Sequence, residues 1–174
     1  MRIIVISDSH GNFKRLHWVI KRHLDSTDLF LHLGDGLQEL EDIRCLYPEQ
    51  KFLAVHGNCD RYSDEKLTRT IDCNGNLIFA CHGDIYGVKS NLDKLKAKAR
   101  MENASIALYG HTHKNFTDYE DGLYIMNPGS ITLPRNGLPL SLIHISSMAL
   151  PLAKHLSTGS QANGSVCGIP VPLP

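Results

Sequence analysis

The sequence predicts an α/β sandwich of two mixed sheets with helices on the outer faces. In the first third of the chain, short apolar runs of strand length alternate with segments of helical periodicity, which is typical of parallel strands joined by crossover helices. Farther on, Asn74-Gly75 and Asp121-Gly122 each separate two apolar runs, and such dipeptides mark the turns of antiparallel hairpins. Both kinds of strand pairing are therefore expected, with the helices covering the sheets.

The alternation begins with RIIVIS at residues 2–7, a continuous apolar run of buried-strand length. A Gly-Asn turn follows, and then apolar residues recur at helical spacing, which predicts a helix. These apolar residues are Phe13, Leu16, Ile20 and Leu24. The next three elements are a strand at 28–33, a helix at 37–47 that Pro48 ends, and a strand at 51–56.

The later part of the chain is richer in strands. Its predicted elements are a hairpin of 68–73 with 76–81, a helix at 92–104, a strand at 105–109, a hairpin of 116–119 with 123–127, and a strand at 138–145.

With 174 residues and 42% hydrophobic content, the chain can bury one sizeable core but is too short for two typical domains. We therefore expect a single domain over residues 1–146. Ser, Gly and Pro dominate residues 157–174, which predicts that 147–174 form a loosely ordered tail. The apolar segment MALPLA within it leaves open an ordered extension that covers a sheet edge.

The charges of the chain are balanced, with 18 Lys and Arg against 18 Asp and Glu, and neither sign forms a run. This balance argues against electrostatic capture of nucleic acid or of an anionic membrane surface. The opening apolar run is too short for a signal peptide or a membrane span, and the five Cys include no CxxC pair, which is typical of free thiols in a reducing compartment. We expect a cytoplasmic protein.

Polar side chains follow five of the predicted strands. They lie in Asp8-Ser9-His10, Gly34-Asp35, Gly57-Asn58, His82-Gly83-Asp84 and Gly110-His111-Thr112-His113. Ligands of open α/β sheets bind at the carboxyl ends of the strands, so we expect these side chains to converge. Carboxylate, imidazole and amide donors without a thiolate suit Mn, Fe or Zn. Two such ions about 3.5–4 Å apart, sharing a carboxylate, form the clamp used for in-line phosphoryl displacement.

The motif series D-x-H, G-D, G-N-x-D, H-G and G-H-x-H, followed by NPGS at 127–130, resembles the calcineurin-like metallophosphoesterase superfamily, in particular its small prokaryotic phosphodiesterase branch. The resemblance covers residues 1 to about 145. It implies a four-layer α-β-β-α fold and hydrolysis of small phosphodiesters by a hydroxide that bridges two divalent ions, Mn first, with Fe, Zn or Ni as alternatives. A phosphomonoesterase of the same fold is the alternative activity.

The resemblance also assigns roles to the matching positions. Asp35, Asn58 and His82 are the residues it implies in catalysis. The implied metal ligands are Asp8, His10 and His113 for one ion, Asn58, His82 and His111 for the other, and Asp35 as the bridge between them.

Cys59 occupies the position where many phosphatases of the superfamily carry a His that protonates the leaving group. A thiol is a poor proton donor to an alkoxide, and no neighbouring base in the sequence would make Cys59 a nucleophile, so a spacer or a pocket contact is favoured over a catalyst. The second departure is Asp84, which stands where the family often has His and adds negative charge near the pocket.

Two further residues are candidates for substrate binding. Arg135, five residues past Ser130, could reach a phosphate in the pocket, although an exposed loop Arg is more often solvated. Asn12, close behind His10, could contact the substrate or cap the following helix, and capping is favoured.

Two other functional classes compete with a phosphoesterase. A protein-interaction scaffold resembling the small retromer subunit would be indicated by an incomplete set of metal ligands, but all seven positions here carry side chains that can coordinate a metal. A nuclease component would need a basic or aromatic groove, and none is visible in the sequence. The expected partner is a small phosphodiester, and a homo-oligomer remains open.

Overall fold

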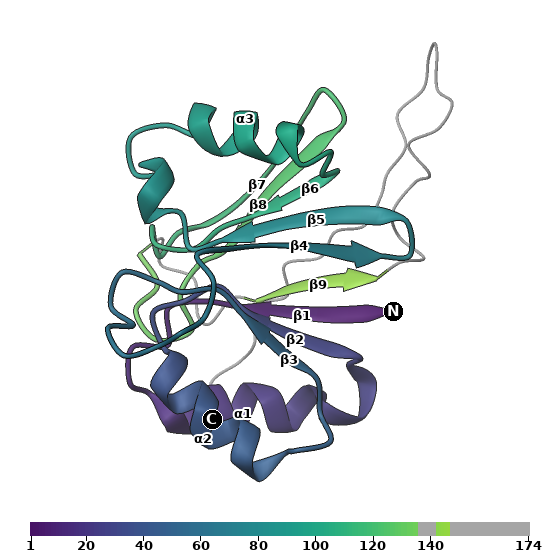
Figure 1. Ribbon diagram of the computed structural model, residues 1–174. Coiled ribbons are helices and arrows are strands. Elements are labelled where there is room, and N and C mark those ends of the chain that lie inside the picture. The colour runs from purple at the N-terminus through teal and green to yellow at the C-terminus, as the bar shows by residue number, and fades with distance from the viewer. Residues whose placement is uncertain (136–141, 147–174) are drawn as a thin grey trace.

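The computed structural model describes residues 1–135 and 142–146 and contains two β-sheets (Figure 1). The first sheet has the strand order β3-β2-β1-β9, in which β1, β2 and β3 run parallel and β9 is antiparallel to β1. Its strands are β1 (Arg2–Ile6), β2 (Leu29–His32), β3 (Phe52–Ala54) and β9 (Ile143–Ser146).

The second sheet has the order β4-β5-β6-β8-β7. Its middle strands β5, β6 and β8 run parallel, whereas β4 and β7 join as the outer strands of two antiparallel hairpins. The strands are β4 (Thr68–Cys73), β5 (Asn76–Cys81), β6 (Ile106–Leu108), β7 (Asn115–Glu120) and β8 (Leu123–Pro128).

Helices cover the outer faces of both sheets, so the molecule has four layers in the order α-β-β-α (Figure 1). The first sheet is covered by α1 (Phe13–His23) and α2 (Leu37–Leu46), and the second by α3 (Asp93–Met101). Two single-turn 3₁₀ helices, Leu24–Ser26 and Asp84–Tyr86, complete the helical segments of the described residues. The predicted fold class is confirmed.

Alternation along each strand builds the core. In β1, Ile3 and Val5 pack against the second sheet, while Ile4 and Ile6 pack against the helices on the outer face. All four are at most 1% exposed, as expected for a strand buried on both faces. Since burying one such side chain contributes about 1.5–3 kcal/mol, β1 is a major source of stability for the site that follows it.

The predicted elements are present, with corrections at their ends. The helix predicted at 92–104 spans only Asp93–Met101, because the chain turns at Asn103 in the left-handed region. Within the described residues the last strand is Ile143–Ser146, and residues 138–141 of the predicted range lie outside the described part of the chain. The predicted tail at 147–174 lies outside it too, and the single domain over 1–146 stays a prediction.

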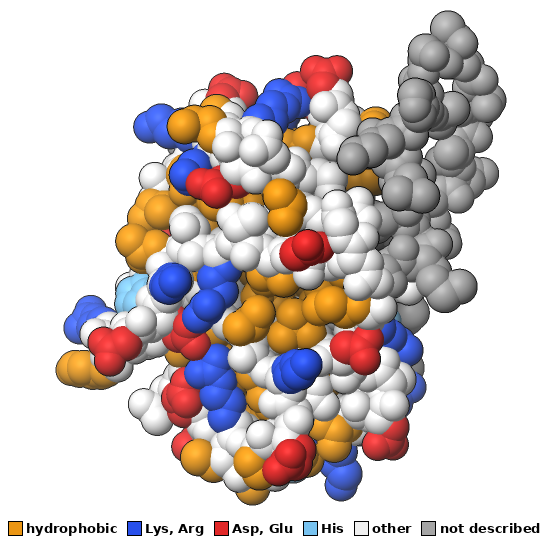
Figure 2. Space-filling view, turned by 45° about the vertical axis from the view of Figure 1, so that its right-hand side comes forward, with side chains coloured by type: hydrophobic (Ala, Val, Ile, Leu, Met, Phe, Trp, Pro, Cys, Tyr) orange, Lys and Arg blue, Asp and Glu red, His pale blue; other side chains and the backbone are white. Residues whose placement is uncertain are grey.

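The carboxyl ends of β1, β2 and β3 lie at the same side of the molecule as those of β5 and β6, on the left of Figure 1. Loops from both sheets therefore meet there. On the face shown in Figure 2, acidic and basic side chains are interspersed, in keeping with the balanced charge of the sequence. Among the described residues, no helix has both the length and the apolar character that crossing a membrane would require.

Candidate metal centre

The predicted metal ligands are held on strained backbone. Five of them adopt a left-handed conformation, with φ between 44° and 66°: Asp8, His10, Asp35, His111 and His113. Non-glycine residues rarely adopt this conformation, which costs of order 1–3 kcal/mol each and is found preferentially at functional sites. The surrounding fold therefore holds these side chains in positions that the local chain does not favour.

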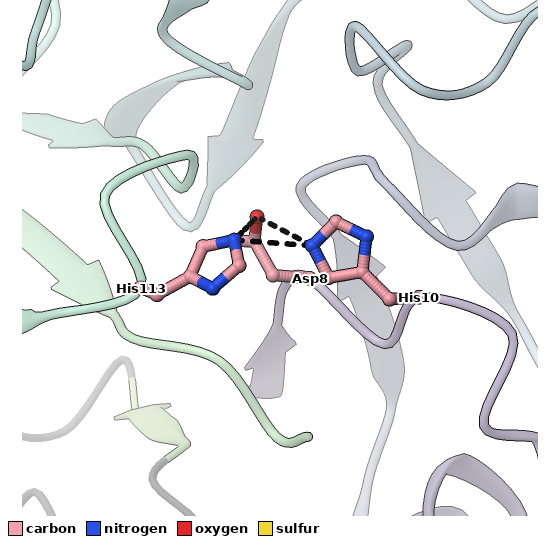
Figure 3. Close-up of side chains that lie close together, drawn as sticks. All are labelled: Asp8, His10 and His113. Atoms are coloured by element: carbon pink, nitrogen blue, oxygen red, sulfur yellow. Dashed lines mark hydrogen bonds and ion pairs between the residues drawn. The ribbon is translucent and has the colours of Figure 1, made fainter. Parts of the chain in front are cut away.

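Asp8, His10 and His113 form a first group of donors (Figure 3). The Nε2 atoms of the two histidines lie 3.0 Å apart, and the Asp8 Oδ1 atom lies 3.2 Å from that of His113 and 3.7 Å from that of His10. Donor atoms on one ion at a bond length of about 2.1 Å lie about 3.0–3.4 Å from one another. The spacing within this group fits a shared divalent ion.

The hydrogen bonds of Asp8 also fit a cation. Its Oδ2 atom accepts hydrogen bonds from the Ser7 hydroxyl at 2.5 Å and from the His111 main-chain N–H at 3.1 Å. Its Oδ1 atom is buried, and no donor among the described residues hydrogen-bonds to it. A buried carboxylate oxygen without a donor is costly unless a cation neutralises it.

Asn58, His82 and His111 form a second group. The His82 Nε2 atom lies 3.2 Å from both the Asn58 Oδ1 atom and the His111 Nδ1 atom. Asp35 lies between the two groups, because its Oδ2 atom is 3.4 Å from His82 Nε2 and 4.0 Å from His10 Nε2. The three distances around His82 Nε2, of 3.2–3.4 Å, again correspond to donors around one ion. The Asp35 Oδ2 atom lies within 4.0 Å of a histidine of each group.

Main-chain carbonyls orient two of the imidazoles. The Nδ1 atom of His82 lies 2.7 Å from the Leu33 carbonyl oxygen, and that of His113 lies 3.2 Å from the carbonyl oxygen of Leu133. A ring that donates from Nδ1 keeps the Nε2 lone pair free for a metal, which is the usual arrangement of histidine ligands. Both rings thus present the required nitrogen to their group.

The carboxylates of the centre are ionised at neutral pH. Burial acts to raise the pKa of Asp8, but the nearby His113 and Ser7 outweigh it and lower this pKa. Burial likewise opposes ionisation of Asp35, yet His82 holds the pKa of Asp35 well below its ordinary value. In return, Asp35 outweighs the burial of His82 and raises the pKa of that imidazole.

His111 is affected differently. Burial and then the charge of His82 lower its pKa, while the Asp84 carboxylate acts in the opposite direction. Asp84 is half-buried at the start of the 3₁₀ helix after β5. Its effect on the pKa of His111 agrees with the negative charge that the sequence predicted near the pocket.

Asp60 holds the centre together, although no role for it was predicted. Its carboxylate accepts four main-chain hydrogen bonds of 2.7–3.0 Å, from Asp35, Gly36, Leu37 and Gly57. The loops after β2 and β3 are therefore fixed to one another beside two predicted ligands. The final D of G-N-x-D was the only sequence signal, since these donors are main-chain groups that side-chain chemistry does not reveal.

Gly57 is required where those loops touch. A Cβ atom on Gly57 would lie 2.4 Å from the Asp35 Oδ1 atom and 2.5 Å from the Asp35 main-chain nitrogen. Any larger residue would push the predicted bridging carboxylate out of place.

Cys59 lies at the edge of the centre with an unreactive thiol. Burial, and next the Asp35 carboxylate, raise the pKa of Cys59 to about 11. Its main-chain N–H donates to Asp35 Oδ1 at 2.7 Å, and the Asn58 side-chain amide donates to its sulfur at 3.2 Å. The main chain of Cys59 positions the centre, while its neutral thiol is unsuited to nucleophilic attack.

The other two predicted substrate contacts are Asn12 and Arg135. The Asn12 side chain accepts a hydrogen bond from the Arg15 main-chain N–H at 3.1 Å and so caps α1, as favoured from the sequence. Arg135 is exposed, and its main-chain N–H donates to the His113 carbonyl at 3.0 Å. Neither residue lines the pocket beside the centre.

An open pocket of about 790 Å³ adjoins the centre. It begins at His10, Asp35 and Cys59 and extends over the start of α2 and the loop of residues 59–65. Most of its wall was not singled out from the sequence, because a loop's shape depends on contacts between distant segments.

Comparison with known proteins gives consistent matches. A family model described as the calcineurin-like phosphoesterase superfamily domain matches residues 1–148. The probable metallophosphoesterase YsnB of Bacillus subtilis is 32% identical over 136 residues, which is 78% of each chain. Phosphodiesterase YfcE of Escherichia coli is 27% identical, with 81% of this chain and 85% of that one covered. A solved structure of a predicted phosphoesterase from Streptococcus pneumoniae superimposes with a TM-score of 0.72 at 31% identity, over 83% of each chain.

Proposed function

Since the chain belongs to the calcineurin-like phosphoesterase superfamily, we propose that it is a phosphodiesterase that holds two divalent metal ions and hydrolyses small phosphodiesters. The observation that carries the proposal is the arrangement of the seven donors. Two groups of three, each with spacings suited to one ion, lie on either side of the Asp35 carboxylate. In this proposal Asp8, His10 and His113 hold one ion, and Asn58, His82 and His111 hold the other.

When bound, two such ions would supply Lewis-acid activation of water and would neutralise charge on the phosphoryl oxygens. The protein contributes position and electrostatics. The ionised carboxylates of Asp8 and Asp35 attract the cations, and the carbonyls of Leu33 and Leu133 fix the rings of His82 and His113. Because hydrogen bonds on rigid loops hold these groups, little reorganisation is needed when substrate binds.

Two observations favour a diester over a monoester. The thiol at Cys59, with a pKa of about 11, is a weak acid for protonating an alkoxide leaving group. The pocket wall carries six carboxylates and one Arg. Arg44 and Arg69 pair with two of these carboxylates, Glu41 and Glu65, so the wall stays negative and repels a dianionic monoester more than a monoanionic diester. The name of the relative YfcE, a phosphodiesterase, supports the same choice.

Manganese is the ion that we propose first, with iron, zinc and nickel as alternatives, because imidazole, carboxylate and amide donors together suit these metals. A phosphomonoesterase is the alternative activity, and a metal-binding interaction scaffold without turnover is the alternative from another class.

The test is the turnover of bis(p-nitrophenyl) phosphate and p-nitrophenyl phosphate by protein that has been stripped with a chelator and reloaded with Mn. We expect two ions per chain and a preference for the diester. Asp35→Asn should weaken both ion sites and reduce kcat by at least a hundredfold, since one substitution removes charge from both groups. Asp118→Asn, on the exposed edge strand β7, is the matched control.

Near-full turnover by Asp35→Asn would show that Asp35 is not the bridge. Two bound ions without hydrolysis of either ester would favour the scaffold, and a preference for the monoester would favour a phosphomonoesterase.

A further inference from the structure

Tyr62 is the most exposed of the large hydrophobic side chains in the described part of the chain, at 98%. Single exposed aromatic residues are common and need no explanation. Tyr62, however, lines the pocket that begins at His10 and Asp35, on the loop between β3 and β4 at the left of Figure 1. An aromatic side chain thus stands in solvent on the wall of a pocket whose other end is the predicted metal centre.

The loop that carries Tyr62 is closed and fixed at both ends. The His56 main-chain N–H donates to the Lys66 carbonyl at 2.9 Å, which joins the two ends of the loop. Asp60 fixes the first half through its four main-chain hydrogen bonds. Glu65 fixes the second half through Arg44 at 2.8 Å and Arg69 at 2.5 Å. Such a short closed loop is a compact unit and not a free segment.

Within the loop, Tyr62 occupies a tight turn. The Ser63 main-chain N–H donates to the Asp60 carbonyl at 3.2 Å, so Arg61 and Tyr62 are the two central residues of a four-residue turn. Since the backbone is already ordered, binding a ligand would restrict little more than the two side-chain torsions of Tyr62. Tyrosine on a fixed loop therefore provides a large contact area at a low entropic cost.

The rest of the wall indicates which kind of chemical group this area suits. Glu39 accepts hydrogen bonds from the Ser9 hydroxyl and the Gly11 main-chain N–H, both at 2.7 Å, and Glu41 pairs with Arg44 at 2.5 Å. Arg44 neutralises Glu41, but the wall also carries Asp35, Asp60 and Asp64 against Arg61, so it stays negative. A further phosphate would be repelled, whereas a flat uncharged ring could stack on Tyr62 without a partner of opposite charge.

We propose that Tyr62 binds the substrate by stacking against a planar aromatic ring. This ring belongs to an alcohol that is esterified to the phosphate, either an aryl alcohol or a nucleoside that carries a nucleobase. This inference rests on the proposed phosphodiesterase function and adds the type of alcohol that the pocket selects. Tyr62 then sets specificity and affinity for the ester group and has no part in holding the metal ions.

The test compares Tyr62→Ala, Tyr62→Phe and Tyr62→Leu in the Mn-loaded protein. Base or ring stacking on an aromatic side chain is lost on alanine substitution with an effect of about five- to 150-fold. For bis(p-nitrophenyl) phosphate we therefore expect kcat/KM to fall about tenfold in Tyr62→Ala and in Tyr62→Leu, and to stay within about twofold of wild type in Tyr62→Phe. The matched control is Tyr119→Ala, which removes another exposed tyrosine, on β7, and should change nothing.

Methyl p-nitrophenyl phosphate shows which ester group stacks. If its kcat/KM is unchanged in Tyr62→Ala, the ring that stacks is the one that stays on phosphorus. If it falls as much as that of the two-ring diester, the leaving group stacks, and both results support a stacking role.

Two results with bis(p-nitrophenyl) phosphate would overturn the inference while leaving the phosphodiesterase in place. One is a kcat/KM of Tyr62→Ala within twofold of wild type, and the other is a Tyr62→Leu variant as active as Tyr62→Phe. Wild-type protein that hydrolyses neither diester with two ions bound would instead refute the proposed function, and this inference with it.

Discussion

The substitution Asp60→Asn should destabilise the protein strongly, although the two side chains have nearly the same shape. Oδ2 accepts from the main chains of Asp35 at 2.7 Å and Gly57 at 2.9 Å, and Oδ1 from those of Gly36 at 2.9 Å and Leu37 at 3.0 Å. In Asp60→Asn an NH₂ group faces two of these buried donors. Hydrogen bonds to a charged group contribute about 1.5–3 kcal/mol each, so losing two should lower the free energy of unfolding by about 3–6 kcal/mol.

The assay is urea unfolding of the metal-free protein, which separates folding from metal binding. Asp64→Asn is the matched control, because Asp64 is exposed on the same loop and should change the free energy of unfolding by less than about 0.5 kcal/mol. Asp60→Asn should also bind Mn more weakly, since the main chain of Asp35 shifts. A loss below about 1 kcal/mol would refute the idea that these four hydrogen bonds fix the loops.

Two further predictions concern Cys59 and His144. Cys59→His supplies an imidazolium that can protonate a leaving group, so the ratio of kcat/KM for an alkyl monoester to kcat/KM for an aryl diester should rise about 10²-fold. Cys59→Ala should change diester turnover little. Loss of diester turnover in Cys59→Ala with both ions bound would show that the thiol is catalytic. Burial, and next the charge of Arg2, lower the pKa of His144 from 6.5 to about 4. As the pH falls from 6.5 towards 4, this histidine takes up a proton in the unfolded chain before it does so in the folded protein. The free energy of unfolding should therefore fall over this range, by about 1 kcal/mol once solvent screening is allowed for. His144→Gln should flatten this part of the stability curve in chemical denaturation from pH 4 to 7, and an unchanged slope would contradict the assignment.

Much of the fold could be predicted from the sequence because its signals are local. The apolar run of β1, the Asn-Gly and Asp-Gly hairpin turns and the spacing of α1 each report on neighbouring residues. The position of β9 beside β1 could not be predicted, because pairing between the two ends of the domain leaves no local pattern. The helix at 93–101 was placed too long for a different, local reason: the chain leaves the helical conformation at Asn103, which lies in the left-handed region.

The candidate site divides in the same way. Polar residues directly after strands could be collected from the sequence, since the carboxyl ends of parallel strands share an edge. Asp60 and Tyr62 could not be assigned, for different reasons. The partners of Asp60 are main-chain groups on two loops, and the position of Tyr62 depends on how its loop closes through His56 and Lys66.

The donors of each group come from both sheets. Each set of donors is therefore complete only when the two sheets have packed together. Asp8 follows β1 of the first sheet, whereas His113 follows β6 of the second. An ion bound by both residues would link two sheets that otherwise contact each other through apolar side chains. A chain with one sheet formed would offer only a fragment of each donor set, so tight metal uptake should begin only after the sheets have docked, and occupancy would report completed folding.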